Sequence, residues 1–120
     1  MNTSLLAQNA YSSPHSSVRT ASTQEYDAIA RITSALRSAE TAPSRAAAIH
    51  RNRELWATLA TDVATDGNGL PTELRAGIFY LAEFTRQHSS KVLNDEASPD
   101  ILVEINTSIM RGLRQQGLGK

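Results

Sequence analysis

Residues 52–64, NRELWATLATDVA, contain the only tryptophan of the chain and carry the pattern that decides the fold. Large apolar side chains recur in this stretch at three- and four-residue spacing, which predicts an amphipathic helix. On a helical wheel, Asn52 lies roughly 40° from Trp56, close to the centre of the apolar stripe. An amide buried without partners costs about 1–3 kcal/mol, so we expect Asn52 to be hydrogen-bonded inside the folded protein.

The helix that contains this stretch is expected to span about residues 45–64. Pro43 breaks the segment before it, and Ser44 is in position to be its N-cap. The sequence DGNGLP at 66–71 holds two glycines and a proline within six residues, so a turn is predicted there. Proline is favoured at the first position of a helix, so the next helix is expected to begin at Pro71.

Three further helices are predicted from the same periodicity. The first of them starts where Ser22 and Glu25 have the spacing of a capping box. The three helices are expected at about 22–38, about 71–93 and about 99–114.

No segment shows the two-residue alternation of a β-strand. Four helical segments with short connections predict an all-α fold, a small antiparallel bundle of about four helices over residues 22–114. Two alternatives stay open: a three-helix core with the first helix loosely attached, and an obligate dimer that completes the bundle. Residues 1–21 hold few large apolar side chains and are predicted to form a flexible N-terminal arm and linker, and residues 115–120 to be frayed.

The composition excludes several classes of protein. The chain has 120 residues, 40% of them hydrophobic, and no cysteine, which suits one compact domain without disulfides. Twelve basic and twelve acidic side chains balance, so no overall field draws the protein to nucleic acid or to an anionic membrane. The sequence shows neither a secretory signal nor an apolar run long enough to span a bilayer, so a soluble, cytoplasmic protein is expected.

No set of residues typical of catalysis or metal binding is recognisable. The histidines, His15, His50 and His88, do not have the spacing of a metal site, and the chain lacks a cysteine nucleophile, G-x-S-x-G and a phosphate-binding glycine loop. Neither an enzymatic activity nor a cofactor or metal is therefore expected. Arginines alternate with glutamates on the predicted helices, as Arg86 does with Glu83, which favours solvated, self-paired faces over direct binding of nucleic acid.

A polar cluster is expected in the core. Asn106, at the edge of the apolar stripe of the last helix, and His88, on the stripe of the helix before it, are the available partners for Asn52. A buried contact among them would fix the register of the helices, as a buried asparagine does in coiled coils. We favour this structural role over a catalytic one for Asn52, Trp56, His88 and Asn106.

The helix at about 71–93 carries more apolar surface than one core-facing stripe needs. In GIFYLAEF at 77–84 the apolar residues cover most of the helix circumference, so Phe79 and Tyr80 fall outside the stripe. This surplus predicts a hydrophobic groove or patch near Phe79 and Tyr80 that binds a helix of another chain, although the N-terminal arm or the first helix is an equally good cover for the two rings. The residues predicted to contact a partner are Leu55, Leu59, Asp62, Phe79 and Tyr80.

Several segments, taken together, resemble a known protein family. They are NAY at 9–11, EYDAIARITSAL at 25–36, NRELWATLATDVA at 52–64, LPTELRAGI at 70–78, RQHSSKVL at 86–93 and INTSIMRGL at 105–113. In this order and spacing, over about residues 9–114, they are similar to the bacterial flagellar biosynthesis regulator FlaF. One departure from that family is that Ser22, Thr23 and Gln24 precede Glu25, where a Pro-Arg pair is common.

The resemblance implies a cytoplasmic factor that is required for flagellin synthesis and export. The role that it favours is that of a flagellin secretion chaperone, which acts with the translational regulator FlbT. Flagellin polymerises through amphipathic terminal helices that must stay unpaired until export, and the surplus apolar surface would suit one of them. The alternative role is that of a post-transcriptional regulator, which acts through FlbT or on flagellin messenger RNA.

Overall fold

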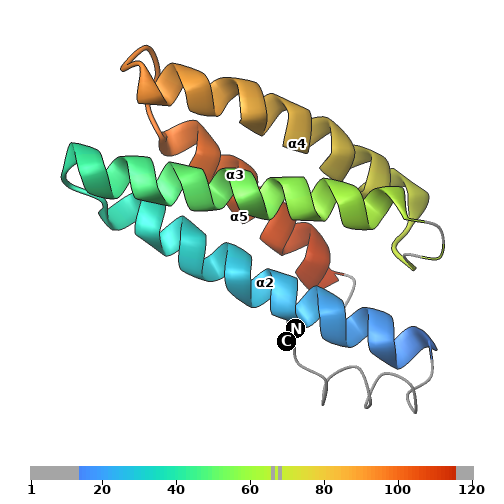
Figure 1. Cartoon of the computed structure of the whole chain (residues 1–120). Helices are drawn as coiled ribbons and strands as arrows, with labels where there is room; N and C mark the ends of the chain where they lie inside the picture. Colours follow the sequence, from blue (N-terminus) through green and yellow to red (C-terminus); the bar gives the residue numbers. More distant parts are fainter. Residues whose placement is uncertain (1–13, 66, 68, 116–120) are drawn as a thin grey trace.

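Four α-helices make up the described part of the chain, and the predicted all-α bundle is confirmed (Figure 1). The structure is a computed structural model, which describes residues 14–65, 67 and 69–115. The helices are α2, Pro14–Ser38; α3, Ala42–Ala64; α4, Thr72–Leu93; and α5, Asp100–Gln115.

Consecutive helices run antiparallel, so the chain passes up and down through the bundle (Figure 1). α3 packs against both α2 and α4, and α5 closes the ring by packing against α2 and α4. In the view of Figure 1, α3 lies in front of α5, with α4 above them and α2 below. α3 and α5 are therefore diagonal partners, whose inward side chains meet at the centre of the bundle.

The first helix begins earlier than predicted. α2 starts at Pro14, not near Ser22, so residues 14–21 of the predicted flexible arm and linker are helical. Ser22 lies inside α2 and cannot be its N-cap, so the predicted capping box with Glu25 is wrong. Proline suits a first helical position because its φ is already helical and its nitrogen carries no hydrogen. The rest of the predicted arm, residues 1–13, lies outside the described residues.

The other three helices agree with the predicted ranges to within a few residues. α3 begins at Ala42 because Thr41, and not Ser44, is its N-cap. The Thr41 hydroxyl accepts a hydrogen bond from the Ser44 backbone at 3.1 Å, and the Ser44 hydroxyl accepts one from the Thr41 backbone at 3.1 Å. Gln115 is the last residue of α5, and the rest of the predicted frayed end lies outside the described residues.

An arginine closes the connection between α3 and α4. Gly67 and Gly69 adopt φ values of 79° and 92°, which glycine adopts without steric strain, so the chain can reverse here. Arg75 of α4 then donates two hydrogen bonds to the backbone carbonyl of Val63, from Nε at 2.9 Å and from Nη2 at 2.7 Å. The guanidinium thereby satisfies a carbonyl at the C-terminal end of α3, where the helix dipole also favours a positive charge.

A Schellman motif ends α4. The backbone N–H of Glu96 donates to the Lys91 carbonyl at 2.8 Å, and that of Asp95 donates to the Val92 carbonyl at 3.1 Å. The motif places one residue in the left-handed region, and here this residue is Asp95, with a φ of 59°. Asp95 therefore occupies a position that glycine prefers.

Two apolar clusters, each built from all four helices, fill the bundle. The first cluster consists of Tyr26, Ile29, Leu55, Trp56, Leu59, Val63, Leu70, Ile78, Ile109 and Leu113. The second cluster consists of Leu36, Ala48, Ile49, Val92 and Leu102. Because both clusters draw on every helix, each helix depends on the other three for burial of its apolar stripe.

Candidate functional site

A layer of buried polar side chains separates the two apolar clusters. Along each helix, these side chains lie between a residue of the first cluster and a residue of the second. Hydrogen bonds have directions, so such a layer restricts which neighbours each helix accepts. The buried polar residues are Thr33, Asn52, Thr85, Ser89 and Asn106, and none is more than 3% exposed.

Asn106 of α5 is the centre of this layer. Its amide nitrogen donates to Asn52 Oδ1 at 2.8 Å and to Thr33 Oγ1 at 3.0 Å, and its oxygen accepts from Trp56 Nε1 at 2.8 Å. The Thr33 hydroxyl in turn donates to the backbone carbonyl of Ile29 at 2.7 Å. Asn106 thus links α5 to both α2 and α3.

Three of the four residues predicted to form a polar cluster come together in this network. Asn52, Trp56 and Asn106 belong to it, but His88 does not. His88 stacks on Phe84 with ring centroids 5.6 Å apart, and its Nε2 has no hydrogen-bond partner. On the helical wheel, His88 lies roughly 80° from the buried Ile78, so it points to the flank of α4 and not to the centre of the bundle.

α4 presents three large aromatic side chains to solvent. Phe79 is 56% exposed, Tyr80 70% and Phe84 40%. On the helical wheel, Phe79 lies roughly 100° from Ile78 on the side of α3, and Phe84 lies roughly 120° from Ile78 in the other direction. The surplus apolar surface of α4 is therefore divided between its two flanks.

Phe79 borders a groove of about 480 Å³ between α3 and α4. Three alanines, Ala57 and Ala60 of α3 and Ala82 of α4, line it together with the ring of Trp56. Alanine side chains are short, so they leave a concave apolar surface between the two helices. A groove of this kind suits the apolar face of a further helix.

Polar side chains also line the α3–α4 groove. The Arg53 guanidinium is held in place because its Nη2 donates to the Arg86 carbonyl at 3.1 Å and to Ser90 Oγ at 2.6 Å. Arg86 itself pairs with Glu83 at 2.6 Å, and this hydrogen bond lowers the pKa of the Glu83 carboxyl. The groove therefore combines apolar surface with the guanidinium of Arg53 and with the ion pair of Glu83 and Arg86.

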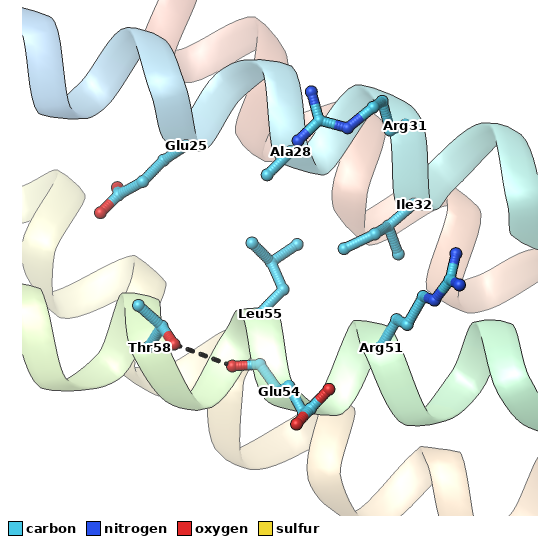
Figure 2. Close-up of a pocket in the computed structure, with 8 residues that line it drawn as sticks. All are labelled: Glu25, Ala28, Arg31, Ile32, Arg51, Glu54, Leu55 and Thr58. Atoms are coloured by element: carbon cyan, nitrogen blue, oxygen red, sulfur yellow. Dashed lines mark hydrogen bonds between the residues drawn. The ribbon is translucent and has the colours of Figure 1, made fainter. Parts of the chain in front are cut away.

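A second groove, of about 740 Å³, lies between α2 and α3 (Figure 2). Leu55 of α3 points into it, toward Ala28 and Ile32 of α2 (Figure 2). This groove is on the side of α3 that faces away from Phe79, because the two grooves lie between α3 and different neighbours. Its charged lining residues are Glu25, Arg31, Arg51 and Glu54.

Glu25 of α2 meets a second carboxylate, Asp62 of α3. Burial, the hydrogen bond with Asp62 and the negative charge of Asp62 together raise the pKa of Glu25 from 4.5 to about 8. At neutral pH Glu25 is therefore mostly protonated and can donate its proton to Asp62. Asp62, which is predicted from the sequence to contact a partner, therefore interacts with Glu25 of α2 within the bundle.

The five residues predicted to contact a partner do not form one surface. Leu59 is 1% exposed and belongs to the first apolar cluster, so its prediction as a partner contact is wrong. Leu55 and Asp62 face α2, whereas Phe79 borders the groove on the α4 side of α3. α3 is covered by α2 on one flank and by α4 on the other, so its buried side includes the flank on which Leu55 and Leu59 lie.

The described part of the chain has neither a membrane-spanning helix nor a cluster of metal-binding side chains. None of its helices combines the length and the apolar character needed to cross a membrane. In the same residues, no group of three or more histidine, aspartate or glutamate side chains is placed to hold a metal ion.

The chain matches the model of a known protein family over most of its length. The family model of flagellar protein FlaF matches residues 7–113 of the chain. The matched range includes all of α2, α3 and α4 and nearly all of α5. No curated protein and no solved structure gives a significant match. The chain therefore belongs to the FlaF family of flagellar proteins.

Proposed function

We propose that this protein is a cytoplasmic, non-enzymatic factor of flagellum biogenesis that binds flagellin and acts as its secretion chaperone. Membership of the FlaF family supports the flagellar role. In this proposal the binding surface is the groove between α3 and α4, which receives one amphipathic helix of flagellin.

The observation that carries the proposal is the exposed ring of Phe79 beside a groove lined with alanines. Phe79 is 56% exposed, although burial of a phenylalanine side chain is worth about 1.5–3 kcal/mol. An exposed ring that borders a concave apolar surface is typical of a binding site, whereas single exposed apolar residues elsewhere need no explanation.

The dimensions and composition of the groove suit a helix better than an extended peptide. The short side chains of Ala57, Ala60 and Ala82 allow close approach, and apolar residues at i, i+3 and i+4 of an incoming helix would fill the space between Phe79 and Trp56. The groove lies between two helices, so it offers no strand edge to which an extended peptide could add. A flagellin helix held in this way would be kept from pairing before export.

Calorimetric titration with monomeric flagellin encoded by the same genome tests the proposal. We expect saturable binding, which the Phe79→Ser substitution weakens about tenfold or more. Ile101→Ser is a matched control, because Ile101 is an exposed apolar residue on α5 and does not line the groove. Absence of binding to flagellin by the wild-type protein would overturn the proposal.

Parallel titrations with FlbT and with flagellin leader RNA separate a chaperone from a regulator of flagellin expression. Direct RNA binding by Lys and Arg contacts to phosphate would weaken steeply with salt, because counterions are released. Affinity for RNA or FlbT without affinity for flagellin would replace the chaperone role with the regulatory one.

A further inference from the structure

Two hydrogen-bond donors that line the α3–α4 groove have no partner. They are the hydroxyl of Thr85 on α4 and the Nε–H of Arg53 on α3, and both atoms are buried. Buried donors are almost always paired in proteins, and an unpaired one costs about 1–3 kcal/mol. Two of them in the lining of one groove indicate a ligand that supplies acceptor oxygens.

Thr85 differs in one hydrogen bond from five other threonines of the described residues. A threonine hydroxyl inside a helix commonly donates to the carbonyl four residues earlier. This bond is present at Thr33, Thr58, Thr61, Thr65 and Thr107. Thr85 is 1% exposed and does not make it, so its hydroxyl remains available to a group that enters the groove.

Arg53 brings a positive charge that no carboxylate of the described residues neutralises through an ion pair. The nearby carboxylate of Glu83 is paired with Arg86 at 2.6 Å. The hydrogen bonds from Arg53 Nη2 to the Arg86 carbonyl and to Ser90 Oγ hold the guanidinium in one orientation. The Nε–H is therefore presented by a fixed, charged group.

We infer that the α3–α4 groove receives an aspartate or glutamate side chain from within the apolar face of the partner helix. Thr85 Oγ1 and Arg53 Nε donate to its carboxylate oxygens, and the apolar lining around Trp56 and Phe79 takes the residues that flank it. A carboxylate fits better than an amide, because it only accepts hydrogen bonds and because its charge strengthens both of them. The identity of the partner as flagellin rests on the proposed function, whereas the chemistry of the site does not.

The Thr85→Val substitution removes one donor at nearly constant shape. It should weaken flagellin binding about tenfold, as expected for the loss of a hydrogen bond to a charged acceptor, and leave the melting temperature unchanged or higher. Thr58→Val is the matched control, because Thr58 lies on the α2 side of α3 and lines the other groove. Equal flagellin affinity of the Thr85→Val variant and the wild-type protein would overturn the inference.

A double-mutant cycle identifies the carboxylate. Each aspartate and glutamate of the terminal helices of flagellin is changed to its amide and titrated against the wild-type protein and against the Arg53→Gln variant. One of these changes should weaken binding to the wild-type protein about tenfold and have little further effect on the Arg53→Gln variant. Purely additive effects at every position would contradict a carboxylate contact with Arg53.

A small carboxylate tests the site without flagellin. On addition of millimolar pentanoate, the NMR signals of the Arg53 Nε–H and of the Thr85 backbone amide should shift, and pentanamide should shift neither. The Thr85→Val variant should respond less to pentanoate. If flagellin does not bind but pentanoate does, the proposed function fails and the site remains; if flagellin binds through Phe79 but pentanoate shifts neither signal, only the carboxylate site fails.

Discussion

The amide nitrogen of Asn106 donates a 2.8 Å hydrogen bond to the side-chain oxygen of Asn52, and this contact joins α5 to α3 across the diagonal of the bundle. Asn106 also donates to Thr33 and accepts from Trp56. The side-chain nitrogen of Asn52, in contrast, has no partner. The two asparagines therefore differ in their hydrogen bonds, because the side chain of Asn106 makes three and that of Asn52 makes one.

Substitution of Asn106 should destabilise the protein more than substitution of Asn52. Asn106→Leu leaves Trp56 Nε1 and the oxygen of Asn52 buried without partners, so we expect the free energy of unfolding to fall by about 2–4 kcal/mol. Asn52→Leu also removes an unpaired nitrogen, so its effect should stay within about 1 kcal/mol. Urea denaturation followed by the fluorescence of Trp56 measures both values.

Two results would contradict this explanation. Equal losses of stability in the two variants would show that Asn106 is not the centre of the layer. If the polar layer specifies the helix pairing, the Asn52→Leu variant should also give broader NMR signals than the wild-type protein. Sharper dispersion in that variant would show that the layer does not select the packing.

The stability of the protein should fall as the pH rises through the range in which Glu25 titrates. The pKa of the Glu25 carboxyl is 4.5 when the group is solvated, as in the unfolded chain, and about 8 in the folded protein. Below about pH 4.5 Glu25 is protonated in the folded and in the unfolded protein. Between pH 4.5 and about pH 8 it ionises only in the unfolded protein, so the free energy of unfolding decreases as the pH rises through this range. The carboxyl is partly solvated, so we expect a loss on the order of 1 kcal/mol.

The Glu25→Gln variant checks this pH dependence. It should lose this part of the pH dependence and be more stable than the wild-type protein at pH 9, as measured by thermal unfolding. Asp62→Asn should move the titration of Glu25 toward its ordinary value, because it removes a negative charge. Glu40→Gln, the same chemical change at an exposed position, is the control and should alter neither property.

The ends of three helices could be predicted because strong breakers mark them. Pro43 in the first turn of α3, the DGNGLP turn at 66–71 and Pro99 just before α5 each prevent the preceding helix from continuing, whatever the rest of the protein does. The start of α2 lacks such a signal. Between Pro14 and Ser22 only Val18 is a large apolar residue, so no periodic stripe indicates a helix, and the later S-T-Q-E pattern resembles a cap although the helix has already begun.

The polar contact could be predicted in part. Asn52 and Asn106 both lie on or beside apolar stripes, and a buried amide needs a partner, so their pairing follows from the sequence. The exclusion of His88 does not follow, because it depends on how far α4 is rotated about its own axis when it packs. That rotation is set by the contacts of the whole bundle and not by the periodicity of one helix.

A hydrophobic groove or patch near Phe79 is predicted from the sequence, but the residues that line the α3–α4 groove could not be identified from it. Ala57, Ala60 and Ala82 are ordinary helix formers, and nothing in the sequence distinguishes an alanine that lines a groove from one on a solvated face. Phe79 is recognisable as a surplus apolar residue. Leu59 is predicted to contact a partner because the cover that α2 gives to this flank of α3 depends on tertiary packing.

Arg75 should contribute to stability through the end of α3 and not through a salt bridge. Its two hydrogen bonds to the Val63 carbonyl involve a charged donor, so Arg75→Met should lower the free energy of unfolding by about 1.5–3 kcal/mol. Arg111→Met is the control, because Arg111 is exposed and should change the stability by less than about 0.5 kcal/mol. Denaturant titration measures both, and equal effects would contradict a capping role for Arg75.

Asp95 offers a site where one substitution should stabilise the protein. Its φ of 59° lies in the left-handed region, which is strained for residues with a Cβ and free of strain for glycine. Asp95→Gly should therefore raise the free energy of unfolding by about 0.5–1 kcal/mol, seen as a higher melting temperature. Asn94→Gly is the matched control: the φ of Asn94 is −91°, so glycine relieves no strain there and only increases the entropy of the unfolded chain. A lower melting temperature for Asp95→Gly would show that the aspartate side chain supports the turn more than its backbone geometry strains it.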